Sequence, residues 1–111
     1  MKTERRDTPR IPIALEAVLQ FQDQNYRRSV TRDISLDGAF VETRDIDLTR
    51  KDQLDLSIRL PTDGEAHYHR FHAHVVRVTE TGAALAFDKT ETAAYEALLD
   101  LVFSRQGRGL W

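Results

Sequence analysis

The chain has 111 residues, of which 41% are hydrophobic, enough for one domain with a modest core but not for two. It has no cysteine and a net charge of −2, so we expect neither disulfides nor a general attraction to DNA or RNA. No segment has the pattern of a signal peptide or a membrane span, and we expect a cytoplasmic monomer that does not bind membranes. Any anion-binding site must therefore come from a local cluster of basic side chains.

The first half of the chain has the alternation of half-buried strands. Residues 1–10 are polar and basic, and we expect them to form a flexible arm. Apolar residues then recur at every second position, which is the period of a strand with one buried face. Polar or glycine-containing turns separate these runs, so the pattern predicts a hairpin followed by a short third strand, over residues 11–21, 26–34 and 39–43.

The second half continues the same pattern and then changes its period. Alternating and β-branched residues predict three further strands, over residues 54–60, 66–79 and 83–87. Strands at this spacing, with turn signals such as Pro61–Gly64 between them, are typical of a small barrel or sandwich. A helical period follows, with one apolar face made by Tyr95, Leu98, Leu99, Val102 and Phe103.

The helix is expected to pack on the barrel, because its apolar face has to be buried against another element. Asp88 with Glu91 predicts a capping box at its start, and Thr90 is the alternative cap. We therefore divide the chain into the arm 1–10, the barrel with its helix 11–104, and a tail 105–111 in which we expect Trp111 to be exposed.

Two arginines lie four residues apart just before the first predicted strand. Pro9 disfavours helix at the residue before it, so Arg6 and Arg10 belong to an extended segment. The planar guanidinium donates two parallel hydrogen bonds, which suits a phosphodiester or the O6/N7 edge of guanine. The alternative is an ordinary solvated basic arm.

A second polar group lies at the end of the second predicted strand. The hairpin brings Asp33, Ser35 and Gly38 back beside the start of the first strand, so we expect the arm and this loop to be neighbours. A carboxylate accepts the N1–H and amino group of guanine, and a serine hydroxyl binds a phosphate or a base edge. Glycine allows a positive φ or a close approach of the backbone to a ligand. The alternative is a plain Asx-type turn.

Together these residues resemble the two-part signature of the PilZ family, Arg6-x-x-x-Arg10 followed by Asp33-x-Ser35-x-x-Gly38. Leu60-Pro61 and the segment 82–87 are also similar to family landmarks. The resemblance implies a six-stranded antiparallel β-barrel with a C-terminal α-helix. It also implies binding of cyclic di-GMP without another cofactor, with the arginines on phosphate and guanine and the Asp, Ser and Gly on the other side.

Four further positions are interpreted through the same resemblance. Lys51 and Ala84 stand where family members often have glycine, and we expect these departures to affect loop shape rather than binding. In members resembling this one, an arginine at the position of Arg5 accompanies binding of two intercalated ligand molecules. The alternative is that Arg5 is one more solvated charge. Arg77 lies near the end of a strand where some relatives place a residue that stacks on guanine, and the alternative is a surface arginine.

Other chemistry is disfavoured. Histidines occur in pairs that fall on opposite faces of one predicted strand, so we expect no metal site from His67, His69, His72 and His74. No nucleophile–base pair, phosphate-cradling loop or pair of catalytic carboxylates can be assembled, so we do not expect an enzyme.

The predicted function is a receptor that changes its arm and surface on binding cyclic di-GMP. We expect the altered surface to regulate an unidentified protein partner in motility, biofilm formation or a related output. One alternative is a protein-interaction adapter that has the fold but no ligand. Another is a small-barrel binder of single-stranded nucleic acid, which the near-neutral charge disfavours.

Overall fold

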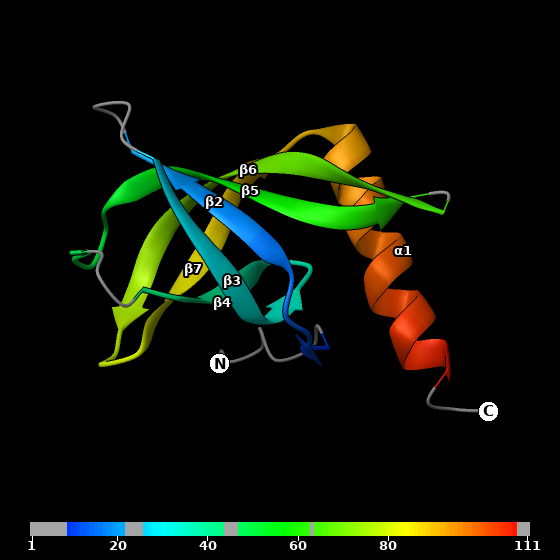
Figure 1. The fold of residues 1–111 in the computed structure, drawn as a ribbon, viewed down its shortest axis with the longest axis horizontal. Coiled ribbons are helices and arrows are strands. Elements are labelled where there is room, and N and C mark those ends of the chain that lie inside the picture. The colour runs from blue at the N-terminus through cyan, green and yellow to red at the C-terminus, as the bar shows by residue number, and fades with distance from the viewer. Residues whose placement is uncertain (1–8, 22–25, 44–46, 63, 109–111) are drawn as a thin grey trace, which may run out of the picture.

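Seven β-strands and one C-terminal helix make up the described part of the chain, residues 9–21, 26–43, 47–62 and 64–108 of a computed structural model (Figure 1). The strands and helix are β1 (Ile11–Pro12), β2 (Glu16–Gln20), β3 (Tyr26–Ser35), β4 (Gly38–Glu42), β5 (Gln53–Thr62), β6 (Glu65–Val78), β7 (Gly82–Thr90) and α1 (Thr92–Arg108). Within these residues no helix is long and apolar enough to cross a membrane.

The strands close into an antiparallel barrel. Their order is β1-β3-β2-β5-β6-β7-β4, and an additional pairing of β3 with β4 joins the two ends of the sheet. Six of the described strands, β2 to β7, form the closed barrel, while the short β1 adds to the edge of β3. The predicted six-stranded barrel with a C-terminal helix is therefore confirmed.

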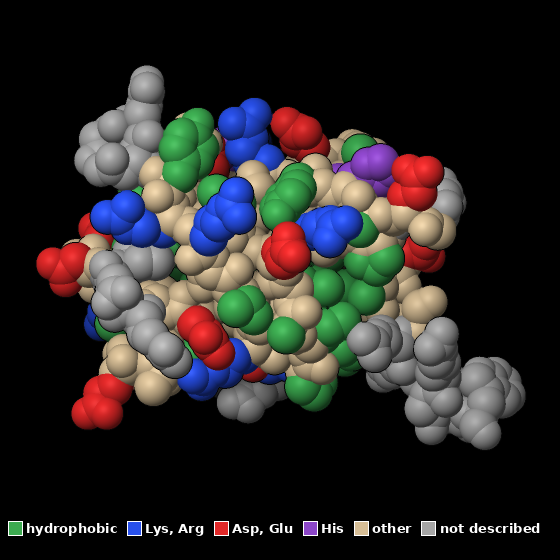
Figure 2. Space-filling model, viewed as in Figure 1, with side chains coloured by type: hydrophobic (Ala, Val, Ile, Leu, Met, Phe, Trp, Pro, Cys, Tyr) green, Lys and Arg blue, Asp and Glu red, His purple; other side chains and the backbone are tan. Residues whose placement is uncertain are grey.

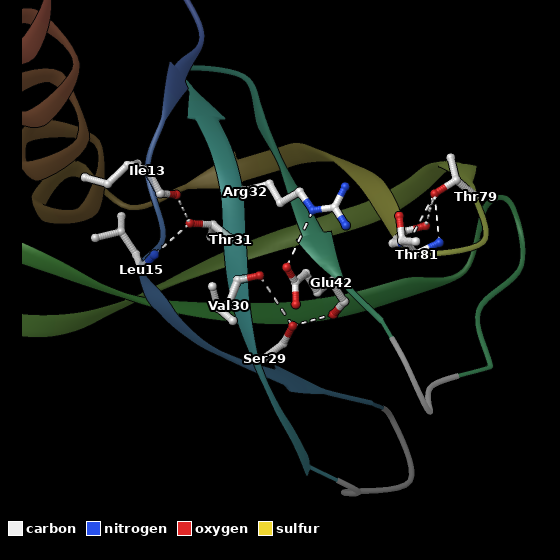
Figure 3. Close-up of polar contacts among 10 residues, drawn as sticks. Ile13, Leu15, Ser29, Val30, Thr31, Arg32, Glu42, Thr79 and Thr81 are labelled. Carbon is white, nitrogen blue, oxygen red and sulfur yellow. Dashed lines mark hydrogen bonds and ion pairs between the residues drawn. The ribbon is translucent and has the colours of Figure 1, made fainter.

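The long first strand that we expected over residues 11–21 is divided into β1 and β2. The side chain of Thr31, which is 1% exposed, fills the gap in the pairing. Its hydroxyl donates to the Ile13 carbonyl oxygen at 2.7 Å and accepts from the Leu15 amide at 2.9 Å (Figure 3). Thr31 thus replaces ladder hydrogen bonds between the interrupted strand and β3.

The buried face of α1 differs from the predicted one. Leu98 and Val102 are fully buried as expected, but Tyr95 is 41% and Phe103 52% exposed. The residues that pack into the core are Ala94, Ala97, Leu98, Leu101 and Val102. Two small alanines therefore take the places that the pattern gave to large side chains. Figure 2 shows hydrophobic side chains reaching the surface beside α1.

The start of the helix also differs from the expected one. Strand β7 continues to Thr90 and α1 begins at Thr92, so neither Asp88 nor Thr90 caps the helix. The helix extends to Arg108, beyond the boundary that we placed at residue 104. It contacts β5, β6, β1 and β3, and so covers one side of the barrel (Figure 1). The division into arm, barrel and tail stays a prediction, and Trp111 lies outside the described residues.

Lys51, just before β5, occupies a backbone conformation that favours glycine. Its φ is 76°, in the left-handed region, where an L side chain costs about 1–2 kcal/mol. Its amide donates to the carbonyl oxygen of Val75 at 2.8 Å, which holds this connection beside β6. The positive φ at Lys51 thus explains why glycine suits this position of the fold.

Gly38, at the start of β4, is required by a close approach of two strands. A Cβ built on Gly38 would lie 2.3 Å from the backbone oxygen of Leu85 on β7, and Gly38 itself does not have a positive φ. The sequence offered a positive φ or a close approach to a ligand as the reason for this glycine. The structure gives a different reason, which is the close approach of the Gly38 backbone to strand β7.

The first prediction concerns the corrected helix face. Leu98→Ala should lower the free energy of unfolding by about 2–5 kcal/mol, because Leu98 is fully buried. Leu99→Ala should cost less, since Leu99 is only half-buried. Urea unfolding followed by circular dichroism measures both, and an equal or larger loss for Leu99→Ala would contradict the assignment.

The second prediction concerns Gly38. Gly38→Ala should lower the free energy of unfolding by about 1–3 kcal/mol, because the added methyl group forces β4 away from β7. Ala39→Gly at the next position provides a control that removes a methyl group instead of adding one. If Gly38→Ala left the urea midpoint unchanged, the strands would not be in such close contact.

Candidate functional site

Arg10, at the end of the predicted arm, meets Asp33 of β3 on the outside of the barrel. Strand β1 pairs with β3 so that Pro12 lies opposite Asp33, and Arg10 precedes β1. The Nη2 atom of Arg10 lies 2.8 Å from Oδ1 of Asp33. Their side chains are 51% and 32% exposed, so the ion pair is accessible from solvent. The predicted proximity of the two halves of the motif is therefore confirmed for this pair.

Ser35 and Gly38 lie on either side of the turn between β3 and β4. The fully buried Ser35 hydroxyl donates to Oδ1 of Asp37 at 2.7 Å and accepts a long hydrogen bond from the Asp37 amide at 3.4 Å. The Asp37 carbonyl accepts from the Phe87 amide at 2.9 Å, which ties the turn to β7. In this structure Ser35 and Gly38 thus support the loop, and their contact with a ligand stays a prediction.

Strand register places Arg77 on the same outer surface as Asp33. Asp33 pairs with Phe40, Phe40 with Ala84, and Ala84 with Arg77. We call these four residues the outward row, because directly opposed residues share one face of a sheet. The row crosses three strand spacings, which is about 14 Å along the sheet. Arg10 and Asp33 therefore lie at one end and the exposed Arg77 at the other.

Two β-bulges turn extra side chains toward this surface. The register of β3 against β4 shifts between Thr31 and Asp33, and that of β6 against β7 shifts between Val75 and Arg77. A bulge sets two residues opposite one, so Arg32 lies beside Asp33 and Val76 beside Arg77 on the outside. Bulges are frequent next to functional sites because they redirect side chains.

Arg32 makes contacts that sequence reasoning missed. Its guanidinium carbon lies over the Phe40 ring, 5.3 Å from the centroid. Its Nε lies 3.5 Å from Oε2 of Glu42 (Figure 3). Strict alternation places Arg32 on the face opposite Asp33, so the period of the strand gave no signal for it. Ala84, which we expected to affect a loop, lies instead within β7 and in the outward row.

The histidine side chains make local pairs. His72 contacts Asp55 and His74 contacts Asp88. Asp55, His72 and Asp88 also line a groove of about 320 Å³ on the barrel surface. In the described parts of the chain, no group of three or more His, Cys, Asp or Glu side chains could hold a metal ion. Arg5 and Arg6 lie outside the described residues, so their predicted roles rest on the motif.

Solved structures share this fold. The inhibitor of motility MotI/DgrA of Bacillus subtilis matches with a TM-score of 0.83 and 23% identity, over 97% of this chain and 54% of that protein. The chain therefore spans about half the length of MotI. The PilZ domain of YcgR from Escherichia coli, solved with c-di-GMP, matches with a TM-score of 0.71 and 16% identity, over 96% of each chain.

A third similar structure is the MrkH–c-di-GMP complex of K. pneumonia, with a TM-score of 0.67 and 13% identity over 96% of this chain and 56% of that one. No curated protein sequence matches. A family model described as the PilZ domain matches residues 4–104. That match covers the arm, the barrel and most of the helix, and with it the chain belongs to the PilZ family.

Proposed function

We propose that this protein is a cytoplasmic receptor for cyclic di-GMP that regulates a protein partner. The observation that carries the proposal is the Arg10–Asp33 ion pair, which joins the two halves of the motif on an exposed surface. Membership of the PilZ family supports it, and so do the c-di-GMP complexes of the similar proteins YcgR and MrkH.

The ion pair is suited to exchange for ligand contacts. Arg10 contacts one oxygen of the Asp33 carboxylate through one nitrogen, so neither group uses all its hydrogen-bonding positions in this contact. An exposed ion pair is worth only about 0–1 kcal/mol. A phosphate or the O6/N7 edge of guanine can therefore take the guanidinium, and the N1–H and amino group of guanine can take the carboxylate.

The rest of the outward row provides room for a dinucleotide. Phe40, with the Arg32 guanidinium over its ring, and the small Ala84 lie between the two charged ends. Arg77 is exposed at the far end of the row, and we propose that its planar group stacks on a second guanine. We assign Arg5 and Arg6 to the same ligand from the motif alone.

Ligand contacts from the arm would hold it against the barrel and change the outer surface. A ligand shifts a conformational equilibrium only through contacts that differ between the two states. Arm arginines that touch the ligand only when the arm is docked meet this condition. We propose that the changed surface is what the partner reads, in motility, biofilm formation or a related output.

The third prediction tests the ion-paired residues. Arg10→Ala should weaken cyclic di-GMP binding by about 5- to 150-fold, because loss of one bidentate contact costs about 1–3 kcal/mol. Asp33→Ala should also weaken it, and cyclic di-AMP, which lacks the guanine donor pair, should bind poorly to the unaltered protein. Isothermal titration calorimetry measures all three affinities.

Arg59→Ala is the matched control, since Arg59 is exposed on β5, where it pairs weakly with Glu16 at 3.9 Å. It should leave binding unchanged. No binding by the unaltered protein would contradict the proposal and favour the ligand-free adapter. Equal affinity for the two dinucleotides would contradict guanine recognition by Asp33.

The fourth prediction is a stoichiometry of two cyclic di-GMP molecules per chain. Two intercalated ligands bring four phosphates and four guanines, and a third arm arginine supplies an additional fork and charge. Arg5→Ala should lower the ratio toward one while Arg10 retains some binding. Calorimetry at concentrations where free ligand is monomeric gives the ratio, and one ligand per unaltered chain would refute the prediction.

A further inference from the structure

We propose that Arg32 forms a stacking platform for a purine base, a subsite on the barrel that lies outside the two-part arginine and Asp-Ser-Gly motif. The inference rests on the proposed function, because it names a further contact of the same dinucleotide. It is carried by the contacts of Arg32 with Phe40 and Glu42 and by the packing of the Phe40 ring on the backbone of Gly82.

The platform is built in layers from the barrel outward. The innermost layer is the backbone of Gly82, where an added Cβ would lie 2.4 Å from Cε1 of Phe40. The ring of Phe40 therefore lies directly on this glycine and has no room to move inward. The Arg32 guanidinium then lies over the ring at 5.3 Å, within the range of a cation–π contact. The Arg32 guanidinium is thus the outermost of these three layers and is supported from below by the ring.

The ion pair with Glu42 fixes the guanidinium without covering it. Oε2 of Glu42 lies 3.5 Å from Nε of Arg32, an atom at the edge of the planar guanidinium group (Figure 3). The Arg32 side chain is still 44% exposed, although the ring lies on one side of it. An edge contact on one atom and a ring beneath leave guanidinium surface open to solvent. Guanidinium planes are surfaces on which unpaired bases stack.

The position of the platform matches that of the candidate site. Because Arg32 is the additional residue of the β3 bulge, its side chain lies on the outside next to Asp33. Asp33 in turn contacts Arg10. A base stacked on Arg32 is therefore next to the carboxylate that we assign to guanine and to the guanidinium that we assign to phosphate or guanine.

The fifth prediction separates stacking from charge. Arg32→Ala and Arg32→Lys should both weaken cyclic di-GMP binding by about 5- to 150-fold, the range for loss of one stacked base. Lysine keeps the positive charge but has no planar group. Arg28→Ala is the control, because Arg28 is exposed on the same strand but pairs with Val18 of β2. Calorimetry gives the affinities, and thermal unfolding confirms that each variant is folded.

Each other outcome has a distinct meaning. Full affinity in Arg32→Lys with weakened binding in Arg32→Ala would overturn stacking and leave a charge contact only. Full affinity in both Arg32 variants, or an equal loss in Arg28→Ala, would overturn the platform while the proposed function stands. Absence of binding by the unaltered protein would overturn the proposed function and the platform together.

Discussion

The hydroxyl of Thr31 holds the point at which strand β3 changes its pairing. The first half of β3 pairs with β2, while its second half pairs with β1 and β4. At the junction, Thr31 bridges the Ile13 carbonyl and the Leu15 amide from a fully buried position. Without such a substitute, partly buried backbone groups at the break would lose this partner, and leaving a buried polar group unpaired costs about 1–3 kcal/mol. Thr31 therefore holds β3 against the segment between β1 and β2, together with the backbone hydrogen bonds from the Ile13 amide to the Arg32 carbonyl and from the Thr31 amide to the Leu15 carbonyl.

The same junction determines which side chains face a ligand. Thr31 points inward, the bulge turns Arg32 and Asp33 outward together, and Ile34 returns to the core. The sequence pattern predicted most strands because apolar alternation follows burial directly. It could not predict the bulge, because an extra residue in a strand depends on pairing with another strand. Asp33 was found through the motif, whereas Arg32, which has no motif position, was missed.

A similar limit explains the helix. The period correctly predicted a helix with Leu98 and Val102 buried, but the face was rotated toward Tyr95 and Phe103. Large apolar residues dominate a pattern of hydrophobicity along the chain. Close packing of a helix against a barrel instead favours small residues at the contact. Ala94 and Ala97 satisfy that requirement and are buried. Side-chain size at a contact is a tertiary property, so hydrophobicity along the chain does not determine it.

Gly38 and Gly82 contribute both to the packing of the barrel and to the surface of the candidate site. Gly38 allows β4 to approach β7, and Gly82 allows the ring of Phe40 to lie against β7. Gly82 therefore determines how closely the Phe40 ring, which lies between Asp33 and Arg77 in the outward row, approaches the barrel. The polar contacts above that surface are solvent-exposed and individually weak, so they can be exchanged without disturbing the barrel. A rigid sheet that carries loosely paired arginines and carboxylates separates stability from recognition: the glycines determine the shape, and the exposed ion pairs remain free to exchange partners.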